Sequence, residues 1–153
     1  MADNLVMKKL FAVISGASLL LSVGLGNPPV AHADSRCTNA TIAGSYGIQT
    51  TGTILEGGPA QPGLFASNGL IKFDGNGNSS EKQTISFNGT IAPFETSGTY
   101  KVEEDCTVTF KVTDAGTGTQ ITASGVIVKR GTEILLIETS PNTVITGILK
   151  KLD

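Results

Sequence analysis

The chain of 153 residues contains no tryptophan, one histidine and two cysteines. The histidine, His32, lies in an N-terminal segment that we predict to be removed, so the mature protein is expected to lack histidine entirely. Without histidine, Ser–His–Asp and Cys–His nucleophile systems and histidine metal sites are excluded, and two cysteines cannot complete a structural zinc site. We therefore predict no catalytic residue, no metal and no cofactor, and we favour a protein that is not an enzyme.

Residues 1–33 have the pattern of a cleavable secretion signal. A basic start at Lys8 and its neighbour is followed by an apolar stretch and then by glycines and prolines. The small residues Ala31 and Ala33 suit a signal peptidase, which predicts cleavage after Ala33, and the apolar stretch is too short for a comfortable membrane span. We expect a signal helix, a single mature domain over 34–153 in the periplasm or outside the cell, and no membrane span after cleavage. A retained amphipathic or membrane helix is the alternative.

The charge of the chain is nearly balanced, with a formal net charge of −2. No basic block occurs in the predicted mature domain. A surface that binds nucleic acid or an anionic membrane needs such a block, so we predict neither partner. The length suits one domain with a core of its own.

Cys37 and Cys106 are the only cysteines. Export would take them to a compartment where disulfides persist, so we predict one bridge between the start of the domain and its middle. Two free thiols or intermolecular pairing are the alternatives.

Apolar and polar residues alternate along the mature chain between turns rich in glycine, which is typical of β-strands. A helical turn is expected over 39–43. The run Ile-Leu-Leu-Ile at 134–137 is continuously apolar, which predicts a strand covered on both faces. The pattern predicts eight strands, over 46–54, 64–73, 81–88, 94–102, 106–112, 120–128, 134–137 and 144–149.

Short connections favour antiparallel pairing of consecutive strands, and eight such strands can close into a barrel. We therefore predict an all-β, eight-stranded antiparallel up-and-down β-barrel, with a β-sandwich as the alternative. Glycines within the strands favour the barrel, because tight curvature requires such positions. They are Gly47, Gly52, Gly69, Gly98, Gly125 and Gly147.

The segment Asp-Gly-Asn-Gly-Asn at 74–78 matches the first half of a calcium-binding loop. The sixth position is Ser79 instead of glycine, and the twelfth is Ile85 instead of glutamate. We therefore interpret the segment as a hairpin turn.

Several of these segments together resemble a group of small exported bacterial β-barrel proteins without an assigned activity. They are Cys-Thr-Asn-Ala-Thr at 37–41, Gly-Ser-Tyr-Gly at 44–47, Phe-Asp-Gly-Asn-Gly-Asn at 73–78, Asn-Gly-Thr at 88–90, Gly-Thr-Tyr-Lys-Val at 98–102 and Asp-Cys at 105–106. The resemblance implies a barrel and export, and it implies no catalytic residue.

A looser resemblance is to lipocalin-like and allene-oxide-cyclase-like eight-stranded barrels. Gly-Ser-Tyr at 44–46 stands where lipocalins have Gly-x-Trp at the start of the first strand, with Tyr46 in place of the tryptophan. The layout also resembles that of avidin, but a biotin pocket lined by tryptophan cannot be built from this sequence.

A barrel of this size can hold one small ligand, and aromatic and polar residues on the apolar strand faces are candidates for lining its cavity. Tyr46 and Tyr100, together with Gln83, would orient a mostly apolar ligand. The alternative is that both are core tyrosines whose hydroxyls bond to the backbone. The candidate ligand-binding residues are Tyr46, Phe65, Phe73, Gln83, Phe87, Tyr100 and Phe110.

Three functions remain open at this point. The first is an exported, non-enzymatic barrel that binds a small apolar or amphipathic ligand, or a protein partner. The second is a cyclase- or isomerase-like enzyme that uses one carboxylate such as Glu95. The third is a cell-surface or matrix module whose outer face, including 134–137, forms a homo-oligomer.

Overall fold

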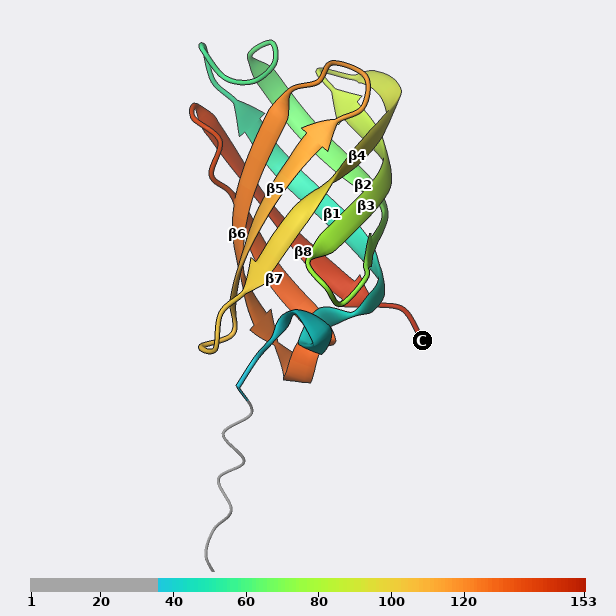
Figure 1. The fold of residues 1–153 in the computed structure, drawn as a ribbon. Helices are drawn as coiled ribbons and strands as arrows, with labels where there is room; N and C mark the ends of the chain where they lie inside the picture. Colours follow the sequence, from blue (N-terminus) through green and yellow to red (C-terminus); the bar gives the residue numbers. More distant parts are fainter. Residues whose placement is uncertain (1–35) are drawn as a thin grey trace, which may run out of the picture. The chain divides into compact units, whose positions relative to one another are not determined.

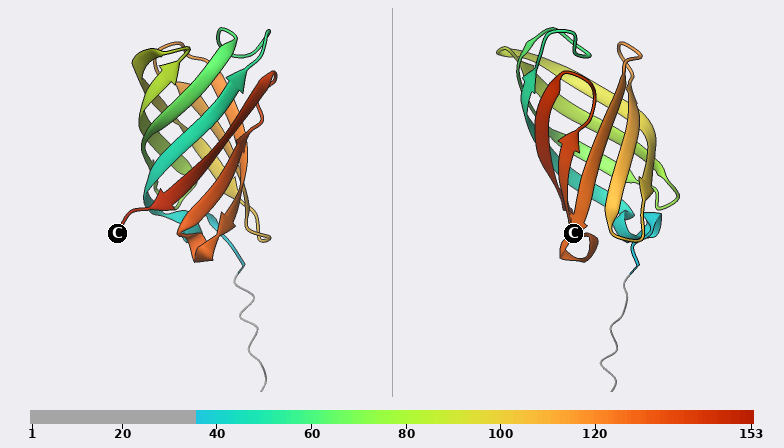
Figure 2. Two further views of the ribbon diagram at one scale, coloured as in Figure 1. Left: turned by 180° about the vertical axis from the view of Figure 1, so that it is seen from behind. Right: turned by 90° about the vertical axis from the view of Figure 1, so that its left-hand side faces the viewer.

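The computed structural model describes residues 36–153, and the predicted signal peptide over 1–33 lies outside this range. The chain forms a closed antiparallel barrel in which each strand pairs with the next and β8 pairs with β1 (Figures 1 and 2). The predicted up-and-down barrel is confirmed, and the sandwich alternative is wrong. The strands are β1 (Gly44–Ile54), β2 (Gly63–Phe73), β3 (Asn78–Phe87), β4 (Thr90–Val102), β5 (Thr107–Asp114), β6 (Gln120–Val128), β7 (Glu133–Glu138) and β8 (Thr143–Lys151).

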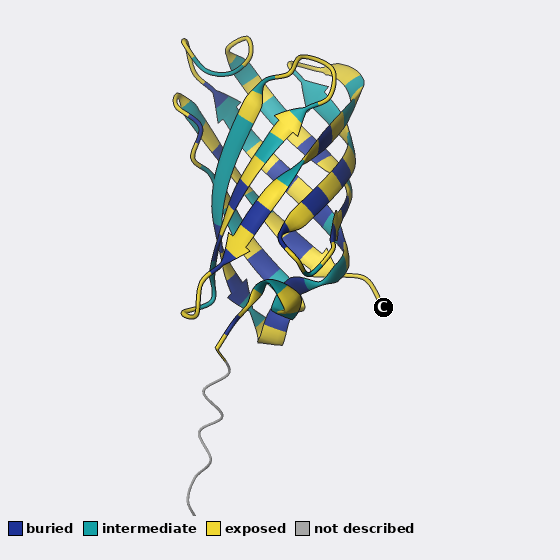
Figure 3. Cartoon of the chain, in the orientation of Figure 1, coloured by how far each residue is buried: buried dark blue, intermediate teal, exposed yellow. Residues whose placement is uncertain are grey.

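Buried and exposed residues alternate along the strands, as Figure 3 shows. In β1, Tyr46, Ile48 and Thr50 are buried, whereas Gln49 and Thr51 between them are exposed. This alternation follows from the pleat, which points successive side chains to opposite faces of the sheet. The inward-facing set therefore builds both the core and any cavity of the barrel.

Two short 3-10 helices, η1 (Asn39–Ile42) and η2 (Lys129–Gly131), lie at one end of the barrel, the lower end in Figure 1. The side chain of Ile42 is fully buried there. Within residues 36–153, no helix is long and apolar enough to cross a membrane. The two helices close this end of the barrel.

Four aromatic rings pack at the closed end. The ring centroid of Phe73 lies 5.4 Å from that of Tyr46, 4.9 Å from that of Tyr100 and 5.9 Å from that of Phe110. Edge-on contacts of this kind add to the stabilisation from burial. This end of the barrel is therefore a filled core.

The tyrosine hydroxyls join this core to the helices. The Tyr46 hydroxyl donates to the carbonyl oxygen of Gly131 in η2 at 2.5 Å. The Tyr100 hydroxyl donates to the carbonyl oxygen of Asn39 in η1 at 3.1 Å and accepts from the backbone N–H of Gly75 at 2.9 Å. Burial, with a smaller contribution from Tyr100, raises the pKa of Tyr46 to about 12. Both hydroxyls thus have backbone partners.

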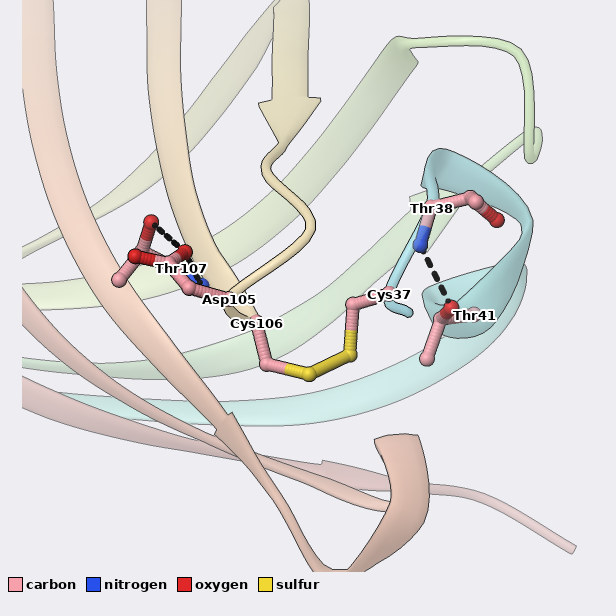
Figure 4. Close-up of a disulfide and its surroundings, with 6 residues drawn as sticks. All are labelled: Cys37, Thr38, Thr41, Asp105, Cys106 and Thr107. Atoms are coloured by element: carbon pink, nitrogen blue, oxygen red, sulfur yellow. Dashed lines mark hydrogen bonds between the residues drawn. A yellow bond between two sulfur atoms is a disulfide. The ribbon is translucent and has the colours of Figure 1, made fainter. Parts of the chain in front are cut away.

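A disulfide links Cys37, just before η1, to Cys106 in the turn between β4 and β5 (Figure 4). The two residues are 69 positions apart, and the backbone N–H of Cys37 also donates to the carbonyl oxygen of Glu104 at 3.4 Å. The predicted bridge is present in the structure. It holds the start of the domain against the closed end of the barrel.

The turn over 74–77 is a hairpin turn closed by its own aspartate. One carboxylate oxygen of Asp74 accepts the backbone N–H of Asn76 at 2.7 Å and that of Asn78 at 2.9 Å. The hydrogen bond from the Asn78 side chain, together with these two from the backbone, holds the pKa of Asp74 below its usual range. The carboxylate therefore stabilises the turn between β2 and β3.

The prediction that the strand over 134–137 is covered on both faces is wrong. Ile134 in β7 is fully buried, but Leu135 and Ile137 are 45% and 52% exposed. Within residues 36–153 the barrel is a single closed sheet, and no second layer covers its outer surface. An apolar run of this kind is typical of a buried strand only where layers pack on both sides.

Candidate ligand-binding cavity

The half of the barrel away from the 3-10 helices encloses a cavity of about 510 Å³. Inward-facing side chains from all eight strands line it, and the loops that follow β1 and β5 contribute residues at its mouth. Cavities that hold small organic ligands typically measure about 300–1,000 Å³. The cavity is therefore large enough for one small molecule.

Most of the wall is apolar. Phe65 on β2, Phe87 on β3 and Phe94 on β4 are only half-buried, because each faces the cavity. The small side chains of Ala92 and Ala123 also line it. The interior is thus filled at one end and hollow toward the other.

One polar network crosses this wall. It consists of Thr50, Ser67, Gln83, Glu81 and Thr96, and we refer to it as the Glu81 network. The oxygens of Thr50 and Ser67 lie 2.5 Å apart, and the Ser67 hydroxyl donates to Oε1 of Gln83. Nε2 of Gln83 donates to Oε1 of Glu81 at 2.5 Å, and the Thr96 hydroxyl donates to Oε2 of Glu81 at 2.9 Å. The network therefore runs from β1 to β4 through side chains alone.

Strand register produces the network. Thr50 is paired with Ser67 across β1 and β2, and Glu81 with Thr96 across β3 and β4. Residues directly opposite in an antiparallel pair project from the same face and contact each other. Glu81 and Gln83 are two positions apart on β3, so both also face inward.

The hydrogen bonds of the network converge on Glu81. The single hydroxyl proton of Ser67 is donated to Gln83, so the hydrogen bond between Thr50 and Ser67 is donated by Thr50. Gln83 and Thr96 then both donate to Glu81. The carboxyl group of Glu81 is thus the final acceptor of the network.

Burial controls the ionisation of this carboxyl group. Glu81 is 8% exposed, and burial raises its pKa to about 7, although the hydrogen bond from Thr96 acts in the opposite direction. Burial also raises the pKa of Glu138 on β7, against a hydrogen bond with Ser140. Both carboxyl groups line the cavity.

The stability of the protein is expected to fall as the pH rises through the range in which Glu81 loses its proton. The usual pKa of a glutamate, 4.5, applies to the unfolded chain, whereas the folded value is about 7. Between these values the folded state holds a proton that the unfolded state lacks, so the free energy of unfolding decreases with pH, by at most on the order of 3 kcal/mol. Urea unfolding from pH 4 to pH 8 measures this decrease.

The matched comparison is between Glu81→Gln and Glu95→Gln on the neighbouring strand. In Glu81→Gln the free energy of unfolding should decrease much less between pH 4 and pH 8. The decrease that remains is the smaller part that Glu138 contributes. Glu95→Gln should leave it unchanged. An unaltered pH profile in Glu81→Gln would contradict the assignment.

The structure divides the predicted ligand-binding residues between the two halves of the barrel. Phe65, Gln83 and Phe87 line the cavity, and Phe110 lies at the boundary, where it lines the cavity and also packs against Phe73 in the core. Tyr46, Phe73 and Tyr100 lie in the filled core instead, and the two tyrosine hydroxyls bond to the backbone. A binding role for the lining residues stays a prediction.

Sequence reasoning missed Glu81 and named Glu95 as the carboxylate for an enzyme. Glu95 does not line the cavity; it lies on the outer face of β4 and pairs with Lys82 at 3.2 Å. The choice of Glu95 is therefore wrong. The alternation that places Gln83 inside also places Glu81 inside, and it was the signal that could have identified this residue.

Comparison with known proteins identifies structures with a similar fold, but it identifies no family. A redesigned β-barrel is similar over 75% of this chain and 95% of its own, with a TM-score of 0.54 and 17% identity. Another redesigned β-barrel, mFAP0 bound to DFHBI, is similar over 72% of this chain and 99% of its own, with a TM-score of 0.48 and 20% identity. No family model and no curated protein matches the chain. The first similarity supports the eight-stranded barrel fold alone.

Proposed function

We propose that the protein is a non-enzymatic binding protein that holds a small, mostly apolar molecule in the barrel cavity. The observation that carries the proposal is the division of the interior, with a filled aromatic core at one end and a cavity of about 510 Å³ at the other. Filling the whole interior would bury more apolar surface and stabilise the fold further. A hollow half with an apolar wall and one polar network suits a ligand instead.

The proposal includes export and cleavage after Ala33. The order of basic, apolar and small residues over 1–33 supports it, and so does the disulfide between Cys37 and Cys106. Disulfides persist in the periplasm and outside the cell. The protein would therefore bind its ligand in the periplasm or outside the cell.

Binding of the neutral apolar dye N-phenyl-1-naphthylamine tests the proposal. The dye is expected to gain fluorescence on saturable, one-to-one binding to the mature protein. Ala92→Trp should weaken this binding by about tenfold or more, because the indole would occupy the cavity. Fluorescence titration at constant protein concentration measures the effect.

Ile91→Trp is the matched control, since it introduces the same side chain one position away. Ile91 is 65% exposed on the outer face of β4, so this variant should bind the dye as the wild type does. If Ala92→Trp does not fold, Thr90→Phe at the mouth replaces it. Absence of saturable dye binding by the wild type, or equal binding by the inward and outward variants, would overturn the proposal.

A further inference from the structure

We infer that the ligand is an apolar amine whose ammonium group lies against the carboxylate of Glu81. The inference rests on the proposed binding function and specifies the chemical class of the ligand. It is carried by the charges of the cavity wall, by the direction of its hydrogen bonds and by the burial of its main acceptor.

The ionisable groups of the cavity wall are all acidic. Glu81, Asp114 and Glu138 line the cavity, and among the described residues no lysine or arginine does. Asp114 lies near the mouth, where its carboxylate accepts from the Gly116 backbone N–H and the Thr117 hydroxyl. A cation entering the barrel would therefore meet only negative charge, whereas an anion would meet only repulsion.

The Glu81 network offers the ligand an acceptor. Its donors point toward Glu81, so the protons of Thr50, Ser67 and Thr96 are already committed within the protein. A carboxylate has about four acceptor positions on its two oxygens, and Gln83 and Thr96 occupy one on each oxygen. The remaining positions suit a ligand that donates hydrogen bonds.

Burial makes an ionic partner favourable at this point. Glu81 is 8% exposed, and no lysine or arginine pairs with it among the ion pairs of the described residues. A buried carboxylate without a counter-charge is costly, and a charge-assisted hydrogen bond from an ammonium group compensates for much of that cost. An alcohol would provide a hydrogen bond without the charge, and a carboxylate ligand would add a second negative charge.

The apolar part of such a ligand has a place in the same cavity. Ile85 and Phe87 continue along β3 from Gln83 toward the mouth, and Phe94 lies on the adjacent strand. A ligand with its amine at Glu81 would place its hydrocarbon part against these side chains. The predicted ligand is thus charged at one end and apolar along the rest.

Ammonium binding should also be coupled to the proton on Glu81. The pKa of Glu81 is raised to about 7, so below that pH the carboxyl group holds a proton that must pass to solvent before the ion pair forms. Affinity for the amine should therefore increase from pH 6 to pH 8. Glu138 and Asp114 face the same cavity, and the raised pKa of Glu138 acts in the same direction.

A competition experiment with three compounds of one shape tests the inference. N-phenyl-1-naphthylamine bound to the wild type is displaced by 1-naphthylmethylamine, by 1-naphthalenemethanol or by 1-naphthoate at pH 8. The amine is expected to compete about tenfold better than the alcohol, because a charged hydrogen bond is stronger than a neutral one, and the carboxylate should compete least. In Glu81→Gln the advantage of the amine should disappear, while Glu95→Gln should retain it.

The outcomes separate the two proposals. If the dye binds and the alcohol or the carboxylate competes as well as the amine, the ligand class is wrong and the proposed binding function stands. If the dye does not bind the wild type, the binding function itself fails. Loss of the amine preference in Glu138→Gln but not in Glu81→Gln would overturn the assignment to Glu81. If Glu81→Gln does not fold, the wild-type pH profile decides, since an affinity for the amine that does not change between pH 6 and pH 8 would contradict the inference.

Discussion

Replacement of Cys37 and Cys106 together by serine is expected to lower the free energy of unfolding by about 4 kcal/mol and the melting temperature by about 15 °C. The bridge connects residues 69 positions apart, so it removes a large part of the conformational freedom of the unfolded chain. It also holds the segment before η1, whose Ile42 is fully buried at the closed end. Urea and thermal unfolding of residues 34–153, with and without the two replacements, measure the loss.

Reduction provides the control for this prediction. A reducing agent should destabilise the wild type to the level of the double variant and leave the variant itself unchanged. Dye binding at low temperature should survive in the double variant, because the bridge lies at the end opposite the cavity mouth. Equal stability of the oxidised wild type and the double variant would show that the bridge contributes nothing.

Gly69→Ala is expected to destabilise the barrel by about 3 kcal/mol, or to prevent folding. A β-carbon built at Gly69 on β2 would lie 2.1 Å from the carbonyl oxygen of Lys82 and 2.6 Å from the α-carbon of Gln83. These are backbone atoms of the paired strand β3, so they cannot move aside as the end of a side chain would. The added methyl group would have to separate two paired strands.

Gly47→Ala is the matched control, on the neighbouring strand β1. A β-carbon at Gly47 would lie 3.8 Å from a side-chain carbon of Leu152 and 3.9 Å from the carbonyl oxygen of Lys150, which are ordinary contacts. This variant should keep or slightly increase the stability, since alanine restricts the unfolded chain. Comparable losses in both variants, measured by urea unfolding, would mean that close strand approach at Gly69 is not the cause.

The alternation in the sequence was sufficient for the strands, but by itself it did not distinguish a barrel from a sandwich. Tyr46, Ile48 and Thr50 indicate one inward face of β1, and the glycines within strands indicate the curvature that the barrel requires. The prediction that Leu135 and Ile137 are covered was wrong, because a local run of apolar residues does not reveal whether a second layer covers the strand. Strand position and inward face are local properties, whereas coverage is not.

The site was harder to predict than the fold, because alternation does not show how far along the barrel a residue lies. Phe65 and Phe73 share the inward face of β2, yet Phe65 lines the cavity and Phe73 packs in the filled core. Only the register of all eight strands determines which of the two lies at the cavity and which in the core. Glu81 was missed for another reason: a charged residue contradicts the usual composition of an interior, and only its partners Gln83 and Thr96 explain its burial.

The pairing of β8 with β1 has a consequence for how the chain folds. Every other strand pair joins neighbours in the sequence and can form as a local hairpin, but this pair joins the two ends of the domain. The backbone N–H of Leu152 donates to the carbonyl oxygen of Ser45, so this contact extends beyond the last strand. Until β8 arrives, β1 and β7 have open edges that can pair with other chains. The last strand therefore protects the protein from aggregation as well as completing the barrel.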